Sequence, residues 1–191
     1  MPEQQLSTDP KPKLWRVILA VAMDPGSLVR SRFAETRFSV ALSVSGAAFL
    51  LFFLQTGIDR ARDGMLGAGG VVMLSLIGLI YGTVGVGLTG VAGWLGARLF
   101  GGNGSLGEAV RAFALAYSAA LIYTLFGLLF NVIFGWNTAV AFGVTGVLWA
   151  LGPMIAALKG MVGGRTWPAT LLATACGLMV LFGWARVGLL V

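Results

Sequence analysis

Long runs without charged residues alternate with short polar clusters along this chain. An apolar run of about 20 residues is long enough to cross the ~30 Å hydrocarbon core of a bilayer. The stretch from Ala112 to Leu158 is uncharged, and Gly135-Trp136-Asn137 supplies a turn signal that divides it into two spans. The runs are apolar on all sides, unlike the alternating strands of a β-barrel. We therefore predict an all-α integral membrane bundle of about five transmembrane helices, at residues 38–56, 70–99, 110–134, 138–158 and 168–186.

Two segments precede this transmembrane domain of residues 38–191: a polar tail over residues 1–13 and a cytoplasmic helical segment over residues 14–37. The apolar residues of the second segment recur at helical spacing: Leu14, Trp15, Ile18, Val21 and Ala22. This stretch is too short to span, and Asp24-Pro25-Gly26 ends it. It predicts an interfacial amphipathic helix, which either lies on the anionic leaflet or packs on the cytoplasmic face of the bundle.

The composition narrows the functional classes. Of the 191 residues, 58% are hydrophobic and only 10% charged, too few to cover a soluble surface, where about 25% is usual. Histidine is absent and Cys176 is the single cysteine, so the commonest metal ligand and general base are missing and no intrachain disulfide can form. We expect no catalytic residues, no cofactor and no metal.

The basic residues predict an orientation. The formal net charge is +6, and in loops between apolar runs this indicates membrane topology rather than nucleic-acid binding. Seven basic residues fall on the side of the N-terminus: Arg30, Arg32, Arg37, Arg98, Arg111, Lys159 and Arg165. Three fall on the other side: Arg60, Arg62 and Arg186. The N-terminus should therefore be cytoplasmic and the C-terminus outside.

Four of these basic residues form a candidate site for anionic lipid headgroups: Arg98, Arg111, Lys159 and Arg165. Simple retention of positive charge on the cytoplasmic side also explains these residues. On the opposite side, Asp59, Arg60, Arg62 and Asp63 follow the first run and are typical of a solvated turn.

Small residues recur along the second span and predict a helix-packing face: Gly78, Gly82, Gly85, Thr89 and Gly93. This face could join two copies of the chain in a homo-oligomer, or it could pack inside one bundle. The following loop, Gly101–Ser105, is glycine-rich, but Ser105 and Glu108 predict a capping box at a helix start rather than a phosphate site.

Ionisable residues inside a span would mark a transport path. The core of each predicted span has none, and Asn131, the most polar residue, falls near the end of its span. Pro153 predicts a kink in the fourth span.

Several motifs between Trp15 and Leu181 resemble the Yip family, the Ypt/Rab-interacting polytopic membrane proteins, and above all its short prokaryotic members. The second span ends in GARLFGGNGSLGEAVRAFALAYSAAL, which is similar to the family's Gly-rich loop and the Ala-Tyr pair of the next helix, here Ala116-Tyr117. WALGPMIAALKGMVGGRTWPATLLATA resembles the family's junction between spans four and five. The chain departs from the pattern in having no proline soon after Ala-Tyr, and Lys159 where a histidine is frequent.

This resemblance implies a five-span protein of the bacterial cytoplasmic (inner) membrane. Eukaryotic members act as adaptors for prenylated small GTPases, but this chain lacks the long tail and offers no residue for that role. We predict a non-catalytic scaffold or adaptor that organises membrane lipids or partner proteins. The alternative is a small transporter or channel-like protein, for which a solvated cavity between spans would be evidence; tight glycine-lined packing would favour the scaffold. An intramembrane enzyme would need a cleft in which Arg98, Glu108, Arg111 and Lys159 lie together.

Overall fold

The structure is a computed structural model that describes residues 14–24 and 36–190, with side chains up to Val187. The predicted polar tail of residues 1–13, together with Arg30 and Arg32, lies outside the described residues. All regular secondary structure in the described part of the chain is helical, as predicted.

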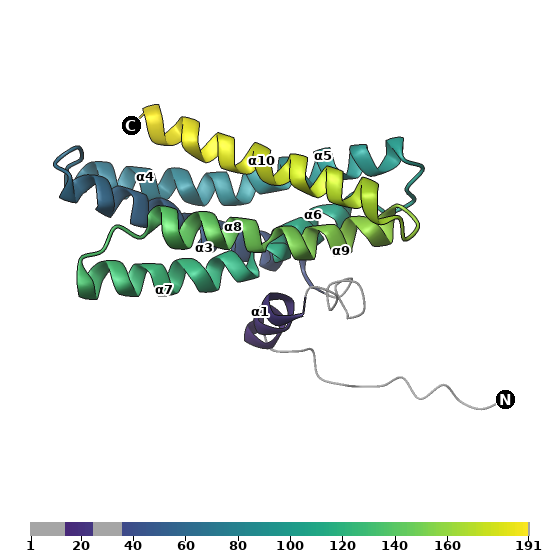
Figure 1. Cartoon of the computed structure of the whole chain (residues 1–191), viewed down its shortest axis with the longest axis horizontal. Helices are drawn as coiled ribbons and strands as arrows, with labels where there is room; N and C mark the ends of the chain where they lie inside the picture. Colours follow the sequence, from purple (N-terminus) through teal and green to yellow (C-terminus); the bar gives the residue numbers. More distant parts are fainter. Residues whose placement is uncertain (1–13, 25–35, 191) are drawn as a thin grey trace.

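Five helical rods, each long and apolar enough to cross a membrane, make up the bundle, so the predicted all-α membrane architecture is confirmed. Their elements are α3 (Phe38–Arg62), α4 (Ala68–Ile80) continued by η2 (Tyr81–Gly85) and α5 (Val86–Leu99), α6 (Leu106–Ala116) with α7 (Ser118–Phe134), η3 (Ala139–Val144) with α8 (Thr145–Trp149) and α9 (Leu151–Met161), and α10 (Thr166–Leu190). The rods run up and down along one axis (Figure 1).

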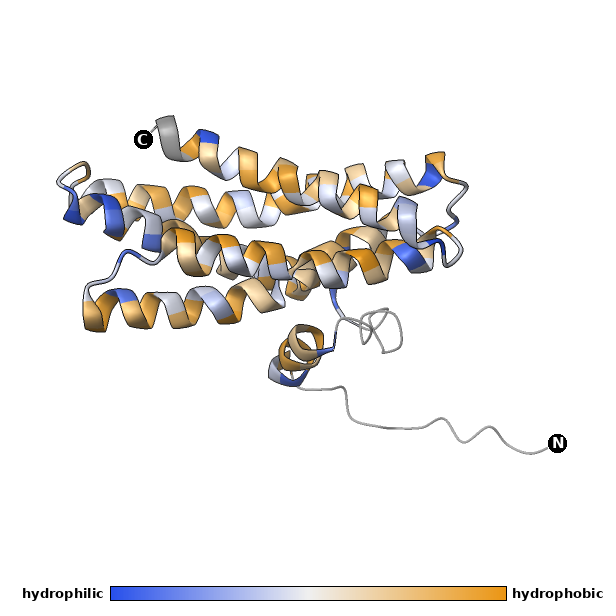
Figure 2. Cartoon of the chain, in the orientation of Figure 1, coloured by the Kyte–Doolittle hydropathy of each residue, from blue (hydrophilic) through white to orange (hydrophobic). Residues whose placement is uncertain are grey.

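Helix α3 is the centre of the bundle, because it packs against α4, η2, α6, α7 and η3. Its aromatic residues Phe49, Phe52 and Phe53 are fully buried and form the core together with Phe113 of α6 and Tyr117. Large apolar side chains are also exposed, as lipid-facing helices require. Hydrophobic residues occur along the full length of the rods (Figure 2).

The two ends of the bundle differ in their loops. The starts of α6 and α10 and the ends of α5 and α9 share one end, which we call the basic end, whereas α3 begins nearer the middle of the bundle (Figure 1). The opposite end, which we call the far end, holds the connections 63–67 and 135–138. Helix α3 reaches the far end at Arg62, beyond the predicted limit at residue 56. The expectation of a solvated turn at Asp59 and Arg62 is therefore wrong, because both residues lie in the last turns of α3.

Glycines bring the second rod into close contact with its neighbours. A Cβ on Gly78 would lie 2.5 Å from the carbonyl oxygen of Phe49, and one on Gly82 would clash with the carbonyl oxygen of Ser45. On the next turns, Gly93 faces the ring of Phe113 and Thr89 is buried. Four residues of the predicted packing face thus lie inside this bundle, where small side chains allow backbones to approach.

Gly85, the fifth residue of that predicted face, is only partly buried. The nearest atoms to a Cβ built there belong to Tyr81 of the same segment, with the closest at 3.5 Å. Gly85 therefore makes no close contact with a neighbouring helix.

Three of the five rods are interrupted. η2 and η3 are π-helical segments, α6 and α7 meet at Tyr117, and α8 and α9 meet at Ala150. The last break comes three residues before Pro153, whose nitrogen cannot donate to the carbonyl of Trp149.

The short helix α1 (Leu14–Met23) lies across the bundle helices and packs on α7 and α6 (Figure 1). Val21 is buried in this contact, and the indole of Trp149 donates a hydrogen bond to the carbonyl of Ala22 at 3.4 Å. Leu14, Trp15, Leu19 and Met23 stay exposed. The helix thus packs on the bundle through one apolar face and leaves a second one uncovered.

Candidate functional site

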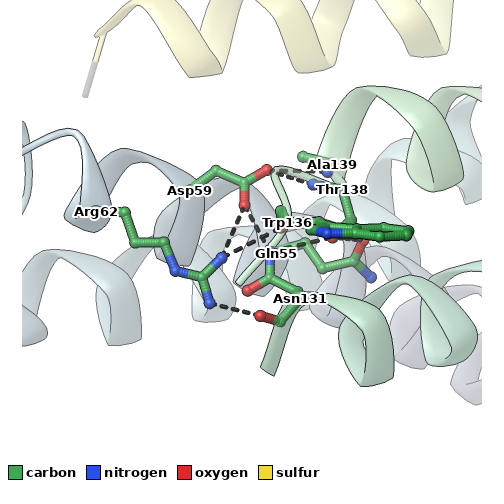
Figure 3. Close-up of polar contacts among 7 residues, drawn as sticks. All are labelled: Gln55, Asp59, Arg62, Asn131, Trp136, Thr138 and Ala139. Atoms are coloured by element: carbon green, nitrogen blue, oxygen red, sulfur yellow. Dashed lines mark hydrogen bonds and ion pairs between the residues drawn. The ribbon is translucent and has the colours of Figure 1, made fainter. Parts of the chain in front are cut away.

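A polar junction closes the far end of the bundle. Gln55, Asp59 and Arg62 lie at helical spacing on α3, so their side chains share one face of it. That face meets the end of α7 and the start of η3, where Asn131 and Thr138 lie (Figure 3).

Asp59 caps the start of η3. Its Oδ2 accepts the backbone N–H groups of Thr138 and Ala139, both at 3.0 Å, and its Oδ1 accepts Nδ2 of Asn131 at 2.5 Å. The first N–H groups of a helix have no partner within the helix and carry partial positive charge. The carboxylate supplies both the acceptor and the negative charge, although its side chain is only 13% exposed.

Arg62 caps the end of α7. Its Nη2 donates to the carbonyl of Asn131 at 2.6 Å, and its Nη1 donates to the carbonyl of Trp136 at 3.2 Å. The same Nη1 lies 3.9 Å from Oδ1 of Asp59. Because a helix C-terminus carries partial negative charge, the guanidinium complements α7 just as Asp59 complements η3. Between them Gly135 turns the chain with a φ of +69°.

Gln55 and Thr138 extend the junction inward. The amide of Gln55 donates to the carbonyl of Thr124 at 2.5 Å, and Thr138 Oγ1 donates to Gln55 Oε1 at 3.3 Å. Asn131 Nδ2 also lies 3.1 Å from Thr138 Oγ1. Among the described residues, Asn131 Oδ1 has no hydrogen-bond partner. Nearly every polar group here is used to hold α3, α7 and η3 together, so the geometry is that of a structural joint.

The chemistry of this joint is limited. Both carboxylate oxygens of Asp59 accept hydrogen bonds, which leaves this residue poorly placed to act as a base. Across the described residues, no three metal-binding side chains lie close enough to share a metal ion. The sequence signal that could have revealed the joint is the spacing of Gln55, Asp59 and Arg62 on one helical face.

The four residues predicted to bind headgroups lie toward the basic end, but their contacts and exposure differ. Arg165 donates through Nε to the carbonyl of Val162 at 3.0 Å and through Nη2 to the carbonyl of Phe100. It therefore caps the ends of α9 and α5. Arg98 and Lys159 are exposed, with the guanidinium of Arg98 5.3 Å from the ring centroid of Trp94, and Arg111 is half-buried on α6.

The loop before α6 is a helix start, as predicted. Ser105 Oγ accepts the N–H of Glu108 at 3.3 Å, and the Glu108 carboxylate accepts the N–H of Ser105 at 3.0 Å. This capping box is complete and engages Glu108 at the start of its own helix.

An apolar groove of about 440 Å³ lies on the outside of the bundle between α3, α5 and α6. Phe38 and Leu42 form one wall, and Leu106, Gly107 and Val110 form the opposite one. The floor runs along the second rod from Thr83 to Val91. The interior is different, because a void beside Phe49, Phe52 and Ala120 has no room for a water molecule.

No protein-family model, curated protein or solved structure is significantly similar to this chain. The resemblance to the Yip family therefore remains a prediction from the sequence motifs.

Proposed function

We propose that this protein is a non-catalytic, Yip-family-like membrane scaffold that organises anionic lipids around a rigid bundle. The observation that carries the proposal is the packing of the second rod, where the helix backbones meet at Gly78 and Gly82 with no space for a side chain. A protein that moves a solute through itself needs space between helices, whereas a scaffold needs a fixed shape.

The polar groups of the spans support the same proposal. Asp59, Arg62 and Gln55 bond to the protein itself at the far end, so they fix the shape of the bundle and form no open ion path. A groove wide enough for a ligand lies on the outer surface of the described part of the bundle, between α3, α5 and α6.

The orientation belongs to this proposal as well. We place the basic end at the cytoplasmic face of a bacterial inner membrane, with the C-terminus outside, because cytoplasmic loops are enriched in Lys and Arg. Arg98, Arg111 and Lys159 would then lie near anionic headgroups, which attract each basic residue by roughly 1 kcal/mol. Arg165 contributes less in this proposal, because its guanidinium already serves two backbone carbonyls.

The test is to extract the full-length protein into native nanodiscs and identify the retained lipids and proteins by mass spectrometry. We expect enrichment of anionic lipid over the bulk membrane, and a loss of roughly tenfold in that enrichment for Arg98→Gln with Lys159→Gln. Arg60→Gln with Arg186→Gln is the matched control, because it removes the same charge from the other predicted side of the membrane. Equal enrichment in all three proteins would contradict the lipid part of the proposal.

A small transporter is the second candidate, and the interrupted rods favour it. Discontinuous spans form the substrate sites of many transporters, and here η2, Tyr117 and Ala150 break three rods. Solute flux into liposomes that contain the purified protein, above that of protein-free liposomes, would support this candidate and contradict the scaffold.

A further inference from the structure

Gly87 and Gly107 make no close packing contact in this bundle. A Cβ on Gly87 would meet a single atom, Leu42 Cδ2, at 4.0 Å, and a Cβ on Gly107 would meet nothing within 4 Å. Gly87 lies in the interior of the second rod, where glycine is the least favourable residue after proline. Helix packing accounts for Gly78 and Gly82 but not for these two residues.

Both glycines line the groove between α3, α5 and α6. Gly87 lies on the floor, which α5 supplies, and Gly107 lies on the wall that α6 supplies, so the absence of two side chains helps to make the space. Its volume of about 440 Å³ is within the usual range of small-ligand sites, about 300–1,000 Å³. The glycines therefore shape a cavity rather than a contact.

The lining of the groove selects an apolar occupant. Thr83 is its one residue with a polar side chain, and that hydroxyl donates to the carbonyl of Leu79 in its own helix at 2.9 Å. The groove opens outward, where Val84 and Leu88 are 57% and 65% exposed. All its walls belong to spanning helices, so the medium outside it is the hydrocarbon of the bilayer. An acyl chain matches that chemistry.

Cationic side chains lie on the helices beside the part of the groove that is nearer the basic end. Arg37 directly precedes the groove residue Phe38 and is exposed. Arg111 follows Gly107 by one helical turn, and Arg98 follows Val91 by two turns, so each shares a face with a groove residue. Long basic side chains can bury their stems in apolar surface while the charge reaches a headgroup.

We propose that this groove binds one acyl chain of an anionic phospholipid, with the lipid phosphate held by Arg37 and Arg111. The inference rests on the proposed lipid-organising function and names the lipid class and the place where it binds. Binding in this groove differs from a general attraction of anionic lipid to the basic loops, because the acyl-chain site depends on the two glycines and not on Lys159.

The test uses substitutions that place a side chain in the groove at positions where glycine makes no close contact. The full-length protein is reconstituted in nanodiscs that contain phosphatidylglycerol and phosphatidylcholine, and retained lipid is counted by native mass spectrometry as bulk lipid is stripped. Wild type should keep one phosphatidylglycerol, and Gly87→Leu and Gly107→Leu should each lower its occupancy about tenfold. Gly69→Leu is the matched control, because Gly69 is the second residue of α4 as Gly107 is of α6, and a Cβ there also meets nothing within 4 Å.

The outcomes separate the site from the broader function. If Gly87→Leu and Gly107→Leu keep the lipid while Arg98→Gln with Lys159→Gln loses it, the groove is not the site although the lipid scaffold stands. If no variant loses lipid, both proposals fail.

Arg37→Gln with Arg111→Gln should remove the preference for phosphatidylglycerol, and an unchanged preference would overturn the assignment of the headgroup. Thermal unfolding of each variant reports folding, and the two leucine variants act from separate helices, so misfolding of one leaves the other as the test.

Discussion

The two halves of α3 make opposite kinds of surface with the same neighbouring rod. The half toward the far end is sealed, and the seal begins at Ser45: Gly82 lies against the carbonyl of Ser45, Gly78 against that of Phe49, and Gly57 against Val71. The half toward the basic end is open, since the groove separates Phe38 and Leu42 from the second rod.

The second rod presents glycines to both halves of α3, so the presence of a glycine alone does not distinguish a packing contact from a cavity. In the sealed half a glycine removes the side chain that would keep two backbones apart. In the open half Gly87 removes a side chain that would have filled empty space. The neighbour of each glycine decides its role, and substitutions at these positions should have effects of opposite sign.

The largest effect is expected in the sealed half. Gly82→Leu would place a side chain against the carbonyl of Ser45 and the Cβ of Phe49, at 2.8 Å from the latter, in a core that cannot widen locally. We expect a loss of about 3 kcal/mol or more of the free energy of unfolding. Thermal unfolding in detergent micelles measures it, and Gly69→Leu, at an open position, should stay close to wild type.

The polar joint should give the next largest effect. Asp59→Ala removes the acceptor of two backbone N–H groups at the start of η3 and of Asn131 Nδ2, and it removes the carboxylate beside the Arg62 guanidinium. A loss of about 2–4 kcal/mol is expected in the free energy of unfolding. Asp63→Ala, in the same cluster but exposed, should change it by less than about 0.5 kcal/mol. Equal effects of the two substitutions would contradict the capping role of Asp59.

A smaller loss is expected at the basic end from Arg165→Ala. The substitution removes the donor to the carbonyls of Phe100 and Val162, which are at the ends of α5 and α9. The contact with Phe100 is exposed and that with Val162 is partly buried, so water replaces part of what is lost and the loss should be about 1 kcal/mol. Hydrogen exchange should rise in the connections 100–105 and 162–165 and stay unchanged in α3.

The smallest effect, of opposite sign, is expected in the open half. Gly87→Ala adds a methyl group that meets only Leu42 Cδ2 at 4.0 Å, and alanine favours the helix. The free energy of unfolding should stay the same or rise by up to about 1 kcal/mol. A clear loss in thermal stability would mean that Gly87 makes a packing contact and would remove the contrast between the two halves.

The sequence by itself determined the number and kind of the spans. In hydrocarbon the backbone is satisfied only in a helix or a closed barrel, and these apolar segments lack the alternation of barrel strands, so five predicted spans give five helices wherever they pack. The capping box at Ser105 and Glu108 could also be predicted from the sequence, because its hydrogen bonds join residues three positions apart. Local chemistry and the bilayer decide both features.

Only the tertiary structure decided which residues work together. Asp59 and Thr138 are 79 residues apart, and the sequence around Asp59 resembles a solvated turn until α7 and η3 are brought beside it. In the same way Gly82 and Gly87 are indistinguishable in the sequence of one rod, yet α3 touches the first and leaves space at the second. Spacing fixes the face of a helix on which a residue lies, but the distance to the neighbouring helix depends on every side chain packed between them.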